Sequence, residues 1–493
     1  MKTRRFTLKS LAGIAFLVLF SNFTFAQIPM ICPDDGFAGD EFGVFVSVSG
    51  DYALVGASAA QVEGTVCGAA YVFKHESGNW TQQAKFVPDI PDNDDMFGKI
   101  LKLDGDYALV AAYNDDDMGS NAGAAYIYKR TDDTWAFQNK IYAADAAAFD
   151  IFGVAADIKG DRAIIGAFGD DDNGFFSGSA YVFIRQGDQW IQEAKLLPSD
   201  GATDDKFGRS VAIDDDLAVV CGVLDDDNGE DSGSVYIFRR NGSSWTEEAK
   251  ITPDDGASND RFGRSISIAG DYVAISAAQK DENGMDGSGS AYVFKYQGGQ
   301  WIQQSKLVPD DLGEGDLMGY CISSNEEFVA ISAHLNDEWA SDAGAVYLFQ
   351  RNGDQWSETA KLTAENPGEM DHFGISVDIS ENTLVVGAPL DQSDDEVECG
   401  VAYVYDLQEY VSTQEVDVDE LTVFPNPARN FIYVKTDEML TGSVLSVYAA
   451  DGKLVVERIL NGNKLDVSGL ASGNYFFELK TLDTVRSGRF VVE

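Results

Sequence analysis

Clusters of aspartate are the residues of this chain that are best suited to chemistry, because carboxylate oxygens bind hard cations such as Ca²⁺. They recur in loops that also contain glycine. We predict Ca²⁺ ligands at seven of these positions, namely Asp170, Asp171, Asp172, Asp225, Asp226, Asp227 and Asp281. None of these loops completes the EF-hand pattern, since the residue at its first ligand position is wrong. The other interpretation is that the carboxylates only keep the protein soluble, and the sequence leaves both open.

A catalytic centre would need an acid, a base or a nucleophile in an arrangement that is not simply repeated along the chain. The three histidines, His75, His334 and His372, show no metal-binding spacing, and the Gly-x-Ser-x-Gly nucleophile motif is absent. Carboxylate pairs are so abundant that a glycosidase pair is neither indicated nor excluded. We therefore predict a protein that is not an enzyme, with a polysaccharide-active enzyme as the alternative.

One tryptophan, Trp339, stands apart from the other six, which follow a regular spacing. It lies in the acidic segment 336–340. An aromatic side chain among carboxylates in a surface loop is a candidate ligand contact. Packing within the loop is an equally good interpretation.

The elements that must position these residues follow from a sequence period. A Phe-Gly pair, with Met for Phe in the sixth case, returns every 55 or 56 residues, beginning at Phe42, Phe97, Phe152, Phe207, Phe262, Met318 and Phe373. Tryptophan keeps the same step at Trp80, Trp135, Trp190, Trp245, Trp301 and Trp356. Tyrosine does so at Tyr71, Tyr126, Tyr181, Tyr236, Tyr292, Tyr347 and Tyr403. A fixed period filled with short strands is typical of a solenoid or a propeller.

The fourth repeat shows what one period contains. Four short runs rich in β-branched and aromatic residues, 207–213, 217–223, 233–238 and 245–251, are separated by turns of Gly, Asn and Asp. Such runs predict an antiparallel meander of four strands. The predicted fold class is therefore all-β, a seven-bladed β-propeller of four-stranded antiparallel blades, followed by a small immunoglobulin-like β-sandwich.

The ends of the repeat region predict how the ring closes. The seventh repeat stops after Tyr405 and lacks its tryptophan strand. Pro33 precedes Phe42 by the same nine residues that separate Pro198 from Phe207. We therefore expect the propeller to span residues 27–407, with residues 27–33 as the missing fourth strand of blade seven.

Two cysteines bear on this closure. By repeat alignment Cys32 matches Leu197, and Cys399 lies near the position of Ser177, roughly opposite across one hairpin. A Cys32–Cys399 disulfide would join the two ends of the propeller and add about 2–4 kcal/mol. Cys67 is a competing partner.

The N-terminus predicts export. A basic stretch precedes an apolar run at residues 11–20, which fits a signal peptide of residues 1–26 cleaved between Ala26 and Gln27. The general export route is favoured, and a twin-arginine route stays open. This run is too short for a stable membrane span, and no second apolar run could cross a membrane. Acidic residues outnumber lysine and arginine 82 to 35, which excludes nucleic acid and anionic membranes as main partners.

Several motifs resemble FG-GAP repeats. They are the Phe-Gly pairs, the Val-Gly-Ala sequences beginning at Val55 and Val386, and strands such as 68–73. The resemblance implies a propeller like the headpiece of integrin α chains and related bacterial surface proteins. Integrin-type repeats often carry a calcium loop between the first two strands. Here that link is a tight turn such as Gly50-Asp51, so calcium at that place is not implied.

The C-terminal segment has a separate character. After a polar linker at residues 408–420, residues 421–493 contain Pro-Asn-Pro at 425–427, Asp-Gly-Lys at 451–453 and Gly-Asn-Tyr at 473–475. This segment is similar to the type A sorting domain of type IX secretion. The resemblance implies contact with the type IX machinery, removal of the domain, and a secreted or outer-membrane cell-surface location.

Together these observations favour a secreted or cell-surface binding propeller that acts in adhesion, with calcium as a candidate stabiliser. Its expected partner is an extracellular protein or glycan that the sequence does not identify. A polysaccharide-active enzyme and a structural surface-coat component are the alternatives, since the fold alone does not choose among them.

Overall fold

The computed structural model divides the chain into two compact units, Met1–Tyr410 and Val411–Glu493. It describes residues 28–392, 399–410, 423–424, 428–429, 431–434, 443–449, 453–460, 464–480 and 485–492. The predicted signal segment 1–26, its cleavage site at Ala26 and Gln27, and linker residues 411–420 lie outside the described residues.

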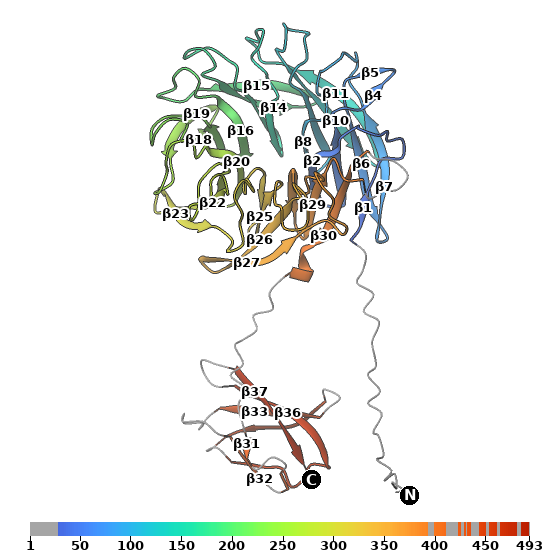
Figure 1. The fold of residues 1–493 in the computed structure, drawn as a ribbon, viewed down its shortest axis with the longest axis vertical. Helices are drawn as coiled ribbons and strands as arrows, with labels where there is room; N and C mark the ends of the chain where they lie inside the picture. The colour runs from blue at the N-terminus through green and yellow to red at the C-terminus, as the bar shows by residue number, and fades with distance from the viewer. Residues whose placement is uncertain are drawn as a thin grey trace, which may run out of the picture. The chain divides into compact units, whose positions relative to one another are not determined.

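The first unit is a ring of seven four-stranded antiparallel sheets, which Figure 1 shows around a common centre. Blades one to three consist of β2 (Phe42–Ser49), β3 (Tyr52–Ala57), β6 (Ala69–Glu76) and β7 (Asn79–Phe86); β8 (Ile100–Asp104), β9 (Tyr107–Ala112), β10 (Ala124–Thr131) and β11 (Thr134–Ile141); and β12 (Ala155–Lys159), β13 (Arg162–Ala167), β14 (Ser179–Gln186) and β15 (Gln189–Leu196). Blades four to six consist of β16 (Phe207–Asp214), β17 (Leu217–Gly222), β18 (Ser234–Asn241) and β19 (Ser244–Ile251); β20 (Phe262–Ala269), β21 (Tyr272–Ala277), β22 (Ser290–Gln297) and β23 (Gln300–Leu307); and β24 (Ile322–Ser324), β25 (Phe328–Ala333), β26 (Ala345–Asn352) and β27 (Gln355–Leu362).

Blade seven combines the two ends of the propeller. Its strands are β28 (Ser376–Ser380), β29 (Thr383–Ala388), β30 (Val401–Asp406) and, on the outside, β1 (Met30–Ile31). Met30 pairs with Tyr403 and Ile31 with Ala402 in antiparallel register. A short hairpin of β4 (Gln61–Val62) and β5 (Thr65–Val66) and a 3₁₀ turn, η1 (Leu407–Tyr410), complete the unit. The first strand of each blade contacts the first strand of the next, and β28 returns to β2, so these strands surround a central channel.

Packing explains why the Phe-Gly pair recurs in the blades. Phe207 is fully buried and its ring packs edge-on against Tyr236 of the same blade, with centroids 5.4 Å apart. Gly208 adopts φ +87°, and a Cβ there would lie 2.2 Å from the carbonyl oxygen of Ser179 in the preceding blade. Only glycine allows this close approach. The Phe-Gly pair therefore fills one blade and lets it contact its neighbour.

The periodic tryptophans join neighbouring blades. The Trp190 ring on β15 packs edge-on against Tyr107 of the preceding blade, with centroids 5.9 Å apart. The Trp245 indole donates a hydrogen bond to Glu193, also in the preceding blade. These contacts explain why tryptophan recurs once in each of the first six blades.

The second unit is a small sandwich of two antiparallel sheets. One has the order β31 (Val423–Phe424), β32 (Phe431–Val434) and β35 (Lys464–Asp466); the other has the order β34 (Leu454–Ile459), β33 (Val444–Ala449), β36 (Gly473–Lys480) and β37 (Val485–Val492). Both sheets contribute to one apolar core that includes Ile432, Leu445 and Phe477.

Candidate functional site

The predicted site residues gather on one face of the propeller, which we call the loop face. It is formed by the segments that join the second and third strands of each blade and by the segments that join successive blades. The former include residues 58–68, 113–123, 168–178, 223–233, 278–289, 334–344 and 389–392. Backbone hydrogen bonds connect the two kinds of segment, for example from Asp204 N to the Phe175 carbonyl (2.9 Å). The loop face is therefore an ordered surface.

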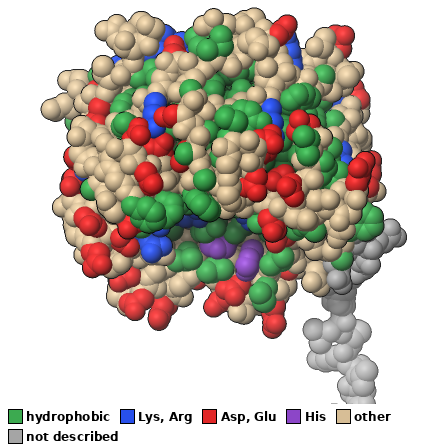
Figure 2. All heavy atoms as spheres, turned by 90° about the horizontal axis from the view of Figure 1, so that it is seen from above, with side chains coloured by type: hydrophobic (Ala, Val, Ile, Leu, Met, Phe, Trp, Pro, Cys, Tyr) green, Lys and Arg blue, Asp and Glu red, His purple; other side chains and the backbone are tan. Residues whose placement is uncertain are grey.

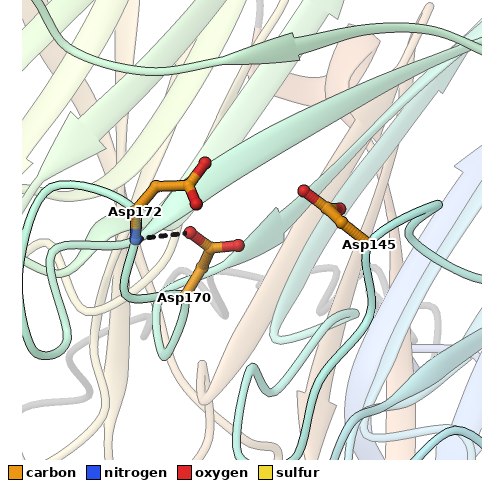
Figure 3. A group of neighbouring side chains, drawn as sticks. All are labelled: Asp145, Asp170 and Asp172. Carbon is orange, nitrogen blue, oxygen red and sulfur yellow. Dashed lines mark hydrogen bonds between the residues drawn. The ribbon is translucent and has the colours of Figure 1, made fainter.

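The predicted ligands Asp170 and Asp172 do come together, and a lysine lies between them. Figure 3 shows their carboxylates with that of Asp145 around a common space, where one oxygen of each lies within 4.8 Å of the others. The ammonium of Lys195 on β15 lies 2.8 Å from Asp145, 2.8 Å from Asp170 and 2.7 Å from Asp172. Asp170 also accepts a hydrogen bond from the Tyr181 hydroxyl (2.9 Å).

Blade four repeats this arrangement. The Lys250 ammonium lies 2.9 Å from Asp225, 2.6 Å from Asp227 and 2.8 Å from Asp200. Burial opposes ionisation of Asp225, but hydrogen bonds from Lys250, Ser234 and Tyr236 hold its pKa below the ordinary value. The carboxylate is therefore ionised and bound to an internal cation.

Lysines occupy the same position in all six blades that have a tryptophan strand. Each follows its tryptophan by five residues and contacts at least one acidic residue of the loop face: Lys85, Lys140, Lys195, Lys250, Lys306 and Lys361. These lysines were not among the predicted site residues, although the spacing Trp-x-x-x-x-Lys recurs with the period of the tryptophans. The acidic loops are consequently tied to their own blades.

The other three predicted ligands, Asp171, Asp226 and Asp281, have a different structural role. Asp171 accepts a hydrogen bond from the backbone N–H of Phe176 (2.8 Å), and Asp226 accepts one from Asp231 (2.8 Å). Asp281 accepts one from the N–H of Gly287 (2.8 Å). These carboxylates hold the turn of their own loop, as is common for aspartate.

These groups of carboxylates fit a lysine ammonium better than a calcium ion. Calcium takes six to eight oxygen ligands at about 2.3–2.6 Å, whereas the space between Asp145, Asp170 and Asp172 is filled by the Lys195 ammonium. A calcium ion there would have to displace the lysine. Calcium binding on the loop face stays a prediction.

The aspartate two residues before each Phe-Gly pair is also a backbone acceptor. Asp150 accepts the N–H of Ala147 (2.7 Å), and the equivalent bond recurs in every blade. Burial raises the pKa of Asp150 to about 6, although the hydrogen bond from Ala147 opposes the shift. Burial raises the pKa of Asp95, Asp205 and Asp371 to about 6 as well.

Exposed apolar side chains mark the loop face. Among the described residues of the propeller, eight large apolar side chains are at least half exposed, and seven of them lie on this face: Phe37, Ile90, Met118, Phe149, Phe175, Trp339 and Met370. The predicted contact residue Trp339 is 64% exposed. Phe175 stacks obliquely on Phe176 with ring centroids 4.3 Å apart, which places aromatic rings together in blade three. These side chains lie in separate loops of one face, which makes the loop face a candidate interaction surface.

The central channel contains two cavities. A cavity of about 890 Å³ lies on the side of the turns between first and second strands, and one of about 230 Å³ lies near the loop face. Lys102 borders both cavities and forms an ion pair with Asp378 (3.2 Å). We call the smaller cavity the channel pocket. It is lined by the residue that follows each Phe-Gly pair, including Lys99, Arg209, Arg264 and Tyr320.

The repeats of the propeller match a known protein family. The FG-GAP repeat family matches seven segments of the chain, residues 25–73, 80–128, 135–183, 190–238, 245–294, 301–349 and 356–405. The chain belongs to the FG-GAP repeat family. Its predicted fold, a seven-bladed FG-GAP propeller with a small C-terminal sandwich, is confirmed.

The C-terminal unit of this FG-GAP protein matches the secretion system C-terminal sorting domain over residues 422–493. The sorting domain directs the protein to the cell surface or the medium and implies interaction with the type IX secretion machinery. Among the described residues, no helix is long and apolar enough to span a membrane.

One solved structure gives a weak likeness to the FG-GAP protein. It is PorZ, described as an essential bacterial surface component of the type IX secretion system of Porphyromonas gingivalis, with 12% sequence identity and a TM-score of 0.45. The alignment covers 94% of this chain and 61% of that one, so the chain spans less than two thirds of that structure's length. No curated protein matches the chain.

The face of the FG-GAP propeller opposite the loop face carries basic residues that are already paired. Lys74 forms an ion pair with Asp133 of the next blade (2.8 Å), and Lys295 forms one with Asp354 of the next blade (2.6 Å). These basic side chains therefore connect hairpins of neighbouring blades and do not form an unpaired cationic surface.

The predicted disulfide cysteines lie close to the ring closure. Cys32 directly follows Ile31, which pairs with Ala402, and Cys399 precedes Ala402 by three residues on the neighbouring chain segment. The Cys399 side chain is buried. The bond between Cys32 and Cys399 stays a prediction.

Proposed function

We propose that the FG-GAP propeller is an adhesion module that binds an extracellular protein or glycan through its loop face. The type IX sorting domain brings the propeller to the cell surface or the medium, where such a partner is available. The observation that carries the proposal is the concentration of exposed apolar side chains on this face. Exposed apolar side chains that are scattered singly over a surface are normal, so it is their shared location on one face that favours this face as the contact.

The structure of the loop face supports binding in a second way. Its loops are held by backbone hydrogen bonds and by lysine–aspartate ion pairs, for example those of Lys195 and Lys250. A surface that is already ordered loses little conformational entropy when it binds. Aromatic residues with few rotatable bonds, such as Phe175 and Trp339, are suited to be the main contacts.

An adhesion assay tests the proposal. Beads coated with the exported protein would be applied to immobilised extracellular polysaccharides and matrix proteins. We expect Phe175→Ala and Trp339→Ala to weaken retention about tenfold each, equivalent to about 1.4 kcal/mol. The control is Ile302→Ala, because Ile302 is 49% exposed but lies on the outer strand β23. Equal retention by the loop-face variants and the control would contradict the proposal.

A further inference from the structure

The channel pocket contains two arginines without an acidic partner. Among the described residues, no carboxylate lies within 4.0 Å of the guanidinium group of Arg209 or Arg264, and no hydrogen bond joins either guanidinium to another residue. This is unusual in a chain with 82 acidic residues and 35 lysines and arginines. A partly buried charge without an acidic partner in the protein is unfavourable, so these arginines favour the approach of an anion.

Arg209 lies near Arg264 and remains charged. Burial lowers the pKa of Arg209 to about 10, and repulsion by Arg264 adds to the shift. Arg209 is therefore still protonated at neutral pH. The Arg264 guanidinium lies over the Tyr320 ring, 4.0 Å from its centroid, which fixes its position by a cation–π contact.

Two tyrosines add hydrogen-bond donors to the pocket. Tyr113 and Tyr320 both line it, and neither hydroxyl has a hydrogen-bond partner among the described residues. Five of the seven periodic tyrosines differ, since their hydroxyls bond to aspartates, as that of Tyr236 does. The buried hydroxyls of Tyr71 and Tyr347 have no such bond among the described residues. The pocket thus offers guanidinium and hydroxyl donors together.

The remaining charged neighbours do not neutralise the arginines. Glu41 accepts a hydrogen bond from Ser58 (2.7 Å) and lies 4.0 Å from Lys99. Asp378 is bound to Lys102. His334 packs against Tyr320 at 4.1 Å, and burial lowers its pKa to about 3, so it is neutral. Figure 2 shows histidine side chains, in purple, at a hollow beside basic side chains.

The fold does not require these charges. The residue that follows the Phe-Gly pair is Val44 in blade one, Val154 in blade three and Ile375 in blade seven. Since apolar residues fill the same place in three blades, Arg209 and Arg264 are not needed to build the ring. Their presence in the adjacent blades four and five calls for another explanation.

We propose that the channel pocket binds an oxyanion group, a carboxylate or sulfate, carried by a single sugar unit. Arginine offers paired donors that match the geometry of such groups. The pocket volume of about 230 Å³ lies below the range of roughly 300–1,000 Å³ that is usual for drug-sized ligands, which fits a group as small as one sugar unit. Tyr113 and Tyr320 supply hydroxyl donors and aromatic surface. This inference rests on the proposed function and specifies its ligand as a glycan with a single acidic sugar unit. A polyanionic chain would be repelled by the excess of acidic residues, as nucleic acid would be.

Calorimetric titration of the exported protein at physiological salt tests the inference. The probes are galacturonate, galactose, sodium acetate and sodium sulfate. We expect galacturonate to bind at least tenfold more tightly than galactose. Arg209→Gln and Arg264→Gln should each weaken galacturonate binding at least tenfold. Arg239→Gln is the matched control, because Arg239 pairs with Glu248 outside the channel and its loss should leave binding unchanged.

Folding of the variants is checked separately. Since Arg209 has no acidic partner, Arg209→Gln should keep or raise the melting temperature, so a loss of binding would not reflect unfolding. Arg209→Lys keeps the charge without the paired donors and should bind with intermediate affinity. This second variant keeps the test valid if Arg209→Gln does not fold.

The free anions distinguish the source of the oxyanion. If acetate or sulfate binds as tightly as galacturonate, and the arginine variants lose this binding, the oxyanion site is supported with a free anion as its ligand. Absence of binding by any anion, or unchanged binding in both arginine variants, would overturn the inference. The adhesion assay with the Phe175 and Trp339 variants is independent of this titration, so a failure here leaves the proposed function standing.

Discussion

Met30 lies opposite Tyr403 in the outer strand pair of blade seven, at the register where Lys195 lies opposite Tyr181 in blade three. The N-terminal strand therefore takes the place of the outer strand but lacks its lysine. Blade seven is closed by two paired residues, of which Ile31 is only 2% exposed. Closure of the ring consequently depends on the packing of this short strand.

Ile31→Ala should destabilise the propeller by about 2–4 kcal/mol, because it leaves a cavity in the core. Ile31 packs with Phe42 of blade one and Val385 of blade seven, so the loss affects the contact that closes the ring. Urea unfolding measures the change. Ile90→Ala is the control, since Ile90 is 67% exposed. If both variants unfold at the same urea concentration, the strand does not hold the ring closed.

The predicted Cys32–Cys399 disulfide can be tested on exported protein. We expect non-reducing peptide mapping to recover the two cysteines in one linked peptide pair. Reduction should then lower the free energy of unfolding by about 2–4 kcal/mol, because the bond closes a long loop. Cys221→Ser serves as control, since Cys221 is buried in blade four, away from the ring closure. Recovery of Cys67 in a linked pair with either cysteine would show that the predicted pairing is wrong.

Lys195→Met should destabilise blade three and create a calcium-sensitive protein. Removal of the ammonium leaves buried Asp170 without its cation, which costs about 3 kcal/mol. Millimolar calcium should restore part of the lost stability of Lys195→Met by binding Asp145, Asp170 and Asp172. It should therefore raise the melting temperature of Lys195→Met more than that of the wild type.

The control for this experiment is Lys206→Met, because no carboxylate lies within 4.0 Å of the Lys206 ammonium among the described residues. Melting curves in EDTA, magnesium and calcium give the readout. A larger calcium effect on the wild type than on Lys195→Met would mean that calcium binds without displacing the lysine, against the geometry described above.

Stability should fall as the pH rises from about 4 to 6.5. The folded-state pKa of Asp150 is raised to about 6, above its unfolded value, so its contribution is complete below the unfolded pKa and is lost through pH 6. Asp95, Asp205 and Asp371 act in the same direction. Asp150→Asn should raise the free energy of unfolding at pH 7.5 by about 1–2 kcal/mol and change it little at pH 4.5.

Asp254→Asn is the control for general charge reduction, because Asp254 is exposed in a segment that joins two blades. Urea unfolding at both pH values separates the two effects. An equal increase in the free energy of unfolding at pH 7.5 in both variants would contradict the prediction. It would show that repulsion among all the negative charges, and not burial of Asp150, determines the pH dependence.

The sequence period was sufficient to predict the architecture. Phe207 and Gly208 mark the start of a blade because Phe207 fills the core and Gly208 permits the close contact with Ser179. The alignment of the repeats placed residues 27–33 beside blade seven, where Met30 and Ile31 pair with β30. The lysine at position 195 could also have been found, since it follows Trp190 by the spacing that recurs in five other repeats.

The channel pocket could not be predicted from the sequence. Arg209, Arg264 and Tyr113 come from three blades and meet only because the ring brings their first strands or loops to one axis. The roles of the loop aspartates were equally hidden. Asp170 and Asp171 are adjacent and chemically identical, yet one binds Lys195 and the other holds a backbone turn.

The most direct test of the central claim is hydroxyl-radical footprinting of the exported propeller, free and bound to an adhesive polysaccharide or matrix protein. We predict that the ligand protects Met118, Phe175, Trp339 and Met370, which are at least half exposed on the loop face. Phe137 and Ile302 on the outer strands should stay equally reactive. Protection of the outer strands or of the opposite face, with the loop face unchanged, would contradict adhesion through the loop face.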